Sequence, residues 1–300
     1  MADRMADQPP VIVMTGATNG MGRLAAFELA RRGVRLGVVA RSRAKADALR
    51  EEIGRLVPGA SVDVFLADLS LLAEVRRAGE EIAARYPRID VLINNAGLHA
   101  FSQRVTSEGY AEMTAVNYLA PWVLTDALRE RLAASAPARI VTVASRASTR
   151  AGVLDLPADL TDTAEFTRRG SSLLYGRSKL MDIMFTQELG RRLKGSGVAV
   201  TCCCPGFNTT GLGRELPLAG ALEKVLTSLH IGDPQHGSDI IVKLATDPDP
   251  AFAESAGGYF AAKGAKALRC PEAGRGEAVQ GALWKATAEL VQGVRRPHGL

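Results

Sequence analysis

The sequence is poor in aromatic residues and in cysteine, and it has no long hydrophobic run. Aromatic residues make up 5% of its 300 residues and its basic residues are scattered, so the net charge of +5 does not indicate a nucleic-acid-binding surface. No window approaches the roughly 20 apolar residues of a membrane span, and the opening MADRMADQPP lacks the apolar core of a signal peptide. We therefore expect a cytoplasmic protein that acts on a small molecule, with neither nucleic-acid nor membrane partners.

The four cysteines show no spacing typical of a metal site or a disulfide framework. Cys202, Cys203 and Cys204 are consecutive and Cys270 stands alone. The three lie in a predicted strand, whose successive side chains point to opposite faces, so we expect buried, reduced thiols that pack as small hydrophobic groups. The four histidines also lack metal-ligand spacing, and no metal is expected.

Short apolar runs alternate along the chain with longer amphipathic stretches. The apolar runs span residues 11–15, 35–40, 62–67, 89–94, 139–144 and 198–204, and the amphipathic stretches span 21–32, 44–56, 70–85, 106–132 and 175–193. This alternation predicts an α/β single-domain Rossmann fold, a doubly wound parallel sheet with helices on both faces. Residues 1–9 would form a disordered lead-in to one domain at 10–295. Ligands of such sheets bind beyond the carboxyl ends of the strands.

A glycine-rich turn, TGATNGMG at 15–22, follows the first predicted strand and leads into a helix. Glycine permits a tight turn and a close backbone approach to a pyrophosphate, which the amino terminus of the helix then attracts. The turn predicts cofactor-binding positions at Gly16, Thr18, Asn19, Gly20, Met21 and Gly22. An ordinary tight turn is the alternative, which the position between strand and helix disfavours.

The second predicted strand ends in arginine where enzymes that prefer NAD have an acid. Arg41 and Arg43 follow this strand, and the nearest acid is Asp47. A guanidinium group matches the geometry of a 2′-phosphate, so Arg41 predicts a preference for NADPH over NADH. The alternative is that both arginines merely begin a solvated helix.

Two further segments follow predicted strands and would complete the cofactor site. Asp68, which precedes Leu69, can accept a hydrogen bond from the adenine amine. The segment NNAG has small residues that let backbone approach the cofactor, at Asn95, Ala96 and Gly97, while Asn94 can tie neighbouring strand ends together.

Four polar residues form a candidate catalytic group. Tyr175 and Lys179 stand four apart and so share one face of a predicted helix. Tyrosine keeps its proton until about pH 10, and a neighbouring ammonium group lowers that pKa. Ser145, at the end of a strand, can donate a hydrogen bond to a substrate oxygen, and Asn117 lies in the preceding helical stretch.

The order of these motifs resembles the short-chain dehydrogenase/reductase family over residues 11–295, with a PG pair at Pro205 and Gly206. The resemblance implies that Tyr175 is the general acid or base and that Lys179 also binds the nicotinamide ribose. It further implies that Ser145 polarises the carbonyl and that Asn117 holds a water in a proton relay. Cofactor-binding roles also follow for Tyr175, Pro205, Gly206 and Thr209, and many relatives are dimers or tetramers.

Within that family the chain resembles the branch of retinol dehydrogenases and protochlorophyllide reductase, through PGFNTTGLGRELPL at 205–218. Phe207 stands where protochlorophyllide reductases have cysteine, so photochemistry is not expected. The segment 206–237 is rich in Leu, Gly and Pro and would form a substrate lid. With His99, Phe207 and Leu212, and with Phe101 nearby, it predicts a bulky apolar substrate, the leading class being polycyclic aromatic ketones of the polyketide type. The alternative is that these leucines only pack helix against sheet.

Three functions remain open from the residues alone. The leading one is an NADP(H)-dependent ketoreductase or alcohol dehydrogenase of secondary metabolism. The second is reduction of a conjugated C=C bond, and the third is a non-catalytic cofactor-binding protein. The Tyr/Lys pair argues against the third, because a sensor has no need of it.

Overall fold

A seven-stranded sheet forms the centre of the computed structural model, which describes residues 8–206 and 233–292. The strand order is β3-β2-β1-β4-β5-β6-β7, and every neighbouring pair is parallel. The strands are β1 (Val11–Thr15), β2 (Arg35–Ala40), β3 (Ser61–Leu66), β4 (Val91–Asn94), β5 (Ala138–Val143), β6 (Val198–Cys204) and β7 (Ala256–Ala261). The predicted doubly wound Rossmann fold is confirmed.

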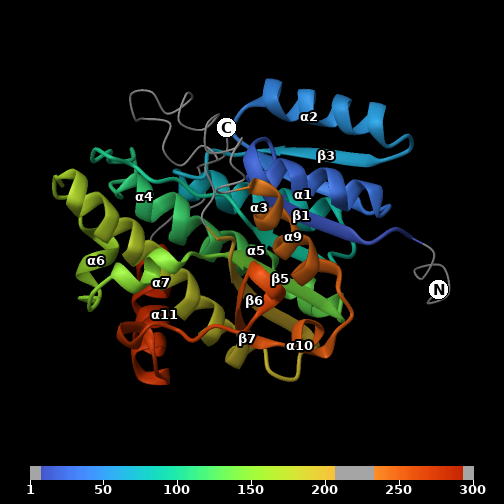
Figure 1. Ribbon diagram of the computed structural model, residues 1–300. Coiled ribbons are helices and arrows are strands. Elements are labelled where there is room, and N and C mark those ends of the chain that lie inside the picture. The colour runs from blue at the N-terminus through green and yellow to red at the C-terminus, as the bar shows by residue number, and fades with distance from the viewer. Residues whose placement is uncertain (1–7, 207–232, 293–300) are drawn as a thin grey trace.

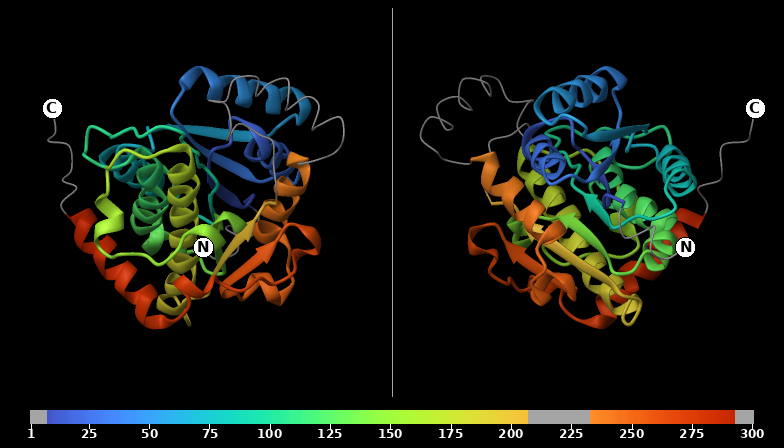
Figure 2. Two further views of the ribbon diagram at one scale, coloured as in Figure 1. Left: turned by 60° about the vertical axis from the view of Figure 1, so that its left-hand side comes forward. Right: turned by 90° about the vertical axis from the view of Figure 1, so that its right-hand side faces the viewer.

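Helices cover both faces of the sheet, as Figures 1 and 2 show. One face carries α1 (Gly20–Arg31), α2 (Arg43–Leu56) and α9 (Pro234–Thr246); the other carries α3 (Leu72–Arg85), α5 (Ala120–Ala134) and α7 (Arg168–Arg192). The last helix, α11 (Glu277–Gln292), packs against α7 and α5 through Trp284, which contacts Phe185 and Trp122. Burial on both faces explains why the strands consist of continuous apolar runs.

The shorter helical segments lie mainly around the ends of the strands. They are α4 (Glu112–Thr114), η2 (Ala115–Leu119), η3 (Arg146–Arg150), α6 (Ala158–Thr161), α10 (Pro250–Ala253), η4 (Lys263–Ala265) and η5 (Glu272–Gly274). In the two described ranges, no helix is both long enough and apolar enough to cross a membrane.

Three details differ from the sequence-based expectation. The seventh strand, β7, was not predicted, because two glycines interrupt its apolar pattern. The stretch 106–132 is not one helix: Val105 and Ala111 form an antiparallel bridge, and η2 is a π-helical turn that joins α4 to α5. Helix α7 begins seven residues before Tyr175, where the side chain of Thr167 accepts a hydrogen bond from the Gly170 N–H.

Candidate active site

The carboxyl ends of β1, β4 and β5 bring the predicted motifs to one edge of the sheet. The glycine-rich turn follows β1, the NNAG segment follows β4, and Ser145 follows β5. Parallel neighbours end at the same edge, so segments about 130 residues apart in sequence become neighbours in space. Helix α7 then carries Tyr175 and Lys179 to this edge.

The turn after β1 and the NNAG segment are locked together by hydrogen bonds. The hydroxyl of Thr15 accepts from the backbone N–H groups of Asn95 and Ala96, both at 3.0 Å. The Asn95 amide in turn donates to the carbonyls of Thr15 and Gly16, both at 3.1 Å. Asn95, and not Asn94, therefore ties the strand ends; Asn94 donates to Thr125 of α5 at 3.0 Å, which corrects the expectation for Asn94.

The glycines of this turn are required by its geometry. Gly16 and Gly20 have φ angles of +69° and +54°, a region that favours glycine. A Cβ on Gly22 would lie 2.2 Å from the Gly16 carbonyl oxygen and 2.4 Å from the Asn95 amide nitrogen. The turn and the NNAG segment thus form a cradle of closely packed backbone, which we call the glycine cradle (residues 15–22 and 94–97).

The amino terminus of α1 opens onto the glycine cradle. Asn19 precedes the helix in an extended conformation and makes no side-chain cap hydrogen bond. The first backbone N–H groups of a helix have no partner within it and bind anions well, with the helix dipole adding to the attraction. The cradle therefore fits the pyrophosphate of a dinucleotide, with Thr18 and Met21 on either side of Asn19 and Gly20.

Arg41 and Asp68 lie together at the far end of this edge. The Arg41 side chain is 73% exposed, and its guanidinium nitrogen is 3.7 Å from a carboxylate oxygen of Asp68. The other Asp68 oxygen accepts from the N–H and the hydroxyl of Ser70 at 2.9 and 2.8 Å. Leu69 packs partly buried against the core. Arg43 is exposed in the first turn of α2, which agrees with the solvated-helix interpretation for that residue, while the role of Arg41 stays a prediction.

The side chain of Ser145, just after β5, lies close enough to Tyr175 of α7 to affect the pKa of the phenol. Ser145 also accepts from the Ala147 N–H at 3.1 Å, which fixes its side chain at the start of η3. Burial raises the pKa of Tyr175, while the neighbouring Lys179 and Ser145 side chains lower it; burial outweighs them, so the phenol holds its proton at neutral pH. Tyr175, Ser145 and Lys179 are thus brought together as predicted.

Lys179 is buried beneath this pair and forms an ion pair that the sequence analysis missed. Its ammonium donates to the Val143 carbonyl and to the Asp182 carboxylate, both at 2.8 Å. Burial raises the pKa of Asp182 to about 6, against the opposing effect of Lys179. The pKa of Lys179 is also raised, because the charge of Asp182 and the weaker effect of Tyr175 together outweigh desolvation. The spacing of three residues on a predicted helix face was the available signal.

Asn117 lies in the π-helical turn η2 and holds the chain that leaves the glycine cradle. Its amide oxygen accepts from the Leu98 N–H at 2.8 Å, and its nitrogen donates to the Leu98 carbonyl and to the Ser178 hydroxyl at 2.9 and 3.0 Å. Single π-helical turns within helices are frequent at functional sites. Its role in holding a relay water stays a prediction.

His99 is the predicted pocket residue that the structure places beside Tyr175. The two rings stack with centroids 4.6 Å apart at an interplanar angle of 18°, and Phe101 lies 4.6 Å from His99 on a tilted plane. The Ser171 hydroxyl donates to the Ala100 carbonyl at 2.5 Å and lies 2.9 Å from His99 Nε2. Because that proton is committed to the carbonyl, Nε2 donates to the Ser171 oxygen.

The remaining predicted positions follow β6. Pro205 and Gly206 directly follow this strand, and Gly206 has a φ angle of +84°. Phe207, Thr209, Leu212 and most of the predicted lid lie outside the described residues. All four cysteines are buried, as expected, and burial raises the pKa of Cys202, Cys203 and Cys270. Within residues 8–206 and 233–292, no cluster of three metal-ligating side chains occurs.

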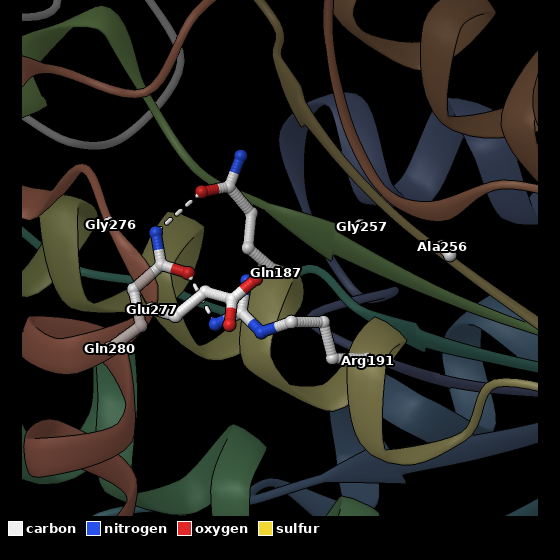
Figure 3. A pocket seen from close by; sticks show the side chains of 7 residues that line it. All are labelled: Gln187, Arg191, Ala256, Gly257, Gly276, Glu277 and Gln280. Atoms are coloured by element: carbon white, nitrogen blue, oxygen red, sulfur yellow. Dashed lines mark hydrogen bonds between the residues drawn. The ribbon is translucent and has the colours of Figure 1, made fainter.

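A separate polar hollow of about 210 Å³ lies where α7, β7 and α11 meet, and Figure 3 shows its lining side chains. Gln280 occupies its centre, accepting from Arg191 at 2.6 Å and donating to Gln187 at 2.7 Å. Gln187 lies twelve residues after Tyr175, about 18 Å along the helix. This hollow is therefore apart from the candidate active site, and its polar groups bond one another.

Comparison with known proteins agrees with the geometry of the site. The family model of the short-chain dehydrogenases matches residues 10–155. The chain is 33% identical to retinol dehydrogenase 13 of Homo sapiens over 93% of this chain and 84% of that protein. It is 34% identical to the protein assigned as the daunorubicin C-13 ketoreductase DnrU of Streptomyces sp. strain C5, over 93% of this chain and 92% of that protein.

Solved structures share the fold over most of the chain. An uncharacterized protein from Mycobacterium paratuberculosis aligns with a TM-score of 0.71 at 26% identity, covering 96% of both chains. A blue fluorescent protein from a metagenomic library, solved in complex with NADPH, aligns with a TM-score of 0.64 at 26% identity, covering 85% of this chain and 96% of that one.

Proposed function

The chain belongs to the short-chain dehydrogenase/reductase family, in its retinol dehydrogenase-like branch, and on this premise we propose that it is an NADP(H)-dependent ketoreductase. The observation that carries the proposal is that Tyr175, Ser145 and the buried Lys179, one helical turn from Tyr175, lie together at the edge where the glycine cradle lies. A phenol that holds its proton at neutral pH beside a hydroxyl suits protonation of a carbonyl oxygen.

The proposed mechanism assigns one task to each side chain. Bound NADP(H) supplies the hydride for the carbonyl carbon. Ser145 donates a hydrogen bond to the substrate oxygen, and Tyr175 gives that oxygen its proton. The Lys179 ammonium stabilises the phenolate that this leaves, and Asn117 would hold a water in the relay that returns a proton to it. In the oxidative direction the same groups act in reverse.

The cofactor preference is proposed from the second strand. Arg41 is largely exposed, at the end of β2, and lies beside Asp68, so its guanidinium group can turn toward a 2′-phosphate without leaving a buried partner. The NADPH complex of the metagenomic relative supports this choice.

The substrate is proposed to be bulky and apolar, with fused-ring aromatic ketones as the leading class. His99 stacks on Tyr175, the proposed proton donor, and Phe101 contacts His99, so aromatic side chains gather where a fused-ring substrate would bind. The likeness to a protein assigned as a ketoreductase of daunorubicin, over nearly its whole length, supports this class.

The test is NADPH oxidation by the purified protein with monocyclic, steroid-like and fused-ring ketones, run beside NADH and the Tyr175→Phe variant. We expect turnover with fused-ring ketones and NADPH that falls at least about 100-fold in the variant, the usual contribution of a positioned proton donor. Better turnover of small polar ketones would refute the substrate class. A product reduced at a conjugated C=C bond would indicate the second chemistry, and tight NADPH binding without turnover would indicate a cofactor-binding protein.

A further inference from the structure

Asp182 forms a buried ion pair with the lysine of the proposed site. The side chains of Lys179 and Asp182 are 5% and 1% exposed, and one carboxylate oxygen of Asp182 lies 2.8 Å from the ammonium. The other oxygen is buried and has no hydrogen-bond partner among the described residues. Burying two charges costs more free energy than a buried pair usually returns, so stability alone is a weak reason for this arrangement.

We propose that Asp182 is a positioning residue that holds the Lys179 ammonium in the cofactor-free site and tunes the proton affinity of Tyr175. This inference rests on the proposed function. It concerns a residue three positions after Lys179, which acts on the proposed site through its contact with that lysine.

The charges around Asp182 identify it as the counter-ion of Lys179. Among residues 8–206 and 233–292, Lys179 is the one cation that acts on Asp182, and Tyr175 faces it from the same helix. Tyr118 of η2 and Cys202 of β6 also face it, but burial raises the pKa of both, so they are neutral at ordinary pH. The negative charge of Asp182 therefore offsets the positive charge by which Lys179 would stabilise a phenolate.

Removing that negative charge lowers the first pKa of the Tyr175 and Lys179 pair, whichever of the two groups loses its proton first. Asp182 raises the proton affinity of both Tyr175 and Lys179, so the first macroscopic pKa of the pair falls when Asp182 becomes a neutral amide. In reduction Tyr175 must be protonated, and the alkaline limb of the rate profile moves to lower pH. His99 and Cys204, which also act on Tyr175, are unchanged and cancel in the comparison.

The variant that tests this is Asp182→Asn, with Glu188→Gln as the matched control. Glu188 lies on the same helix, about 9 Å further along, and pairs with Arg191 and Arg192 away from the site. The first measurement is kcat for ketone reduction against pH. We expect the alkaline limb to move down by at least about one pH unit in Asp182→Asn, the low end of the effect of an adjacent charge, and to stay in place in Glu188→Gln.

The second measurement needs no turnover, and so separates this inference from the proposed function. It is the ultraviolet phenolate titration of the cofactor-free protein, with the same titration of Tyr175→Phe subtracted in each background. The step due to Tyr175 should move to lower pH in Asp182→Asn. A step that stays in place or moves up, in a variant with the circular dichroism of the folded protein, overturns the inference. If Asp182→Asn does not fold, Asp182→Ser removes the same charge and takes its place.

Discussion

Replacing Gly22 by alanine tests whether the glycine cradle is as closely packed as the structure has it. Two effects of this change oppose each other. Alanine in a helix is favoured over glycine by about 1 kcal/mol, which would stabilise α1. The new Cβ would lie 2.2 Å from the Gly16 carbonyl oxygen, well inside ordinary contact, so the turn after β1 or helix α1 must move by about 1 Å. Such overpacking costs about 1–3 kcal/mol, and more where backbone must shift.

The clash is expected to win, and cofactor binding should suffer with stability. The same Cβ would lie 2.4 Å from the Asn95 amide nitrogen, which ties the two halves of the cradle together. We expect Gly22→Ala to lower the free energy of unfolding by up to about 2 kcal/mol as the net of the two effects. NADPH binding should weaken at least about tenfold, or 1.4 kcal/mol.

The matched control is Gly54→Ala in α2. Gly54 is exposed within the helix, and a Cβ there meets nothing within 4 Å, so this variant should gain up to about 1 kcal/mol and bind NADPH normally. Urea unfolding measures the stability of both variants, and fluorescence or calorimetric titration measures NADPH affinity. If Gly22→Ala is stabilised as much as Gly54→Ala, the close packing of the cradle is refuted.

The remaining predictions concern charge. Arg41→Asp should lower the ratio of kcat/KM for NADPH to that for NADH by at least about tenfold, because a carboxylate repels the 2′-phosphate and accepts hydrogen bonds from ribose hydroxyls. An unchanged ratio would refute the assignment of Arg41 to the 2′-phosphate. The protein should lose stability as pH rises through the pKa of Asp182, because folding raises that pKa from 3.8 to about 6. A shift of this size corresponds to about 3 kcal/mol in the free energy of unfolding. The free energy of unfolding of the protein minus that of Asp182→Asn should therefore fall by about 2–3 kcal/mol between pH 3.8 and 7 in urea titrations. A difference that rises with pH, as for a carboxylate with a lowered pKa, would contradict it.

The elements that sequence reasoning located are those whose local pattern agrees with their burial. Five of the six predicted strands are apolar runs buried almost throughout, and β3, at the edge of the sheet, is largely half-buried but still rich in apolar residues. The seventh, AGGYFA at β7, contains two glycines, and its pairing with β6 decides its conformation. Gly257 has a φ angle of +106°, and a Cβ there would lie 2.8 Å from Gln187 Cα. Close packing against α7 therefore requires a glycine at this position, and that glycine interrupts the apolar pattern from which a strand is predicted. Long-range packing of this kind leaves no periodic signal.

The site shows the same division between local pattern and three-dimensional contact. Motif order located Tyr175, Ser145 and Lys179, because parallel strands end at one edge and a helical spacing of four keeps two side chains on one face. Helical spacing also places Asp182 on the face of Lys179, but an aspartate three residues after a lysine usually marks a solvated surface pair. What distinguishes this pair is its position beneath β5 and β6, where it has no solvent to screen it. The charge balance of the proposed proton donor therefore depends on how α7 packs on the sheet, and only the folded structure reveals it.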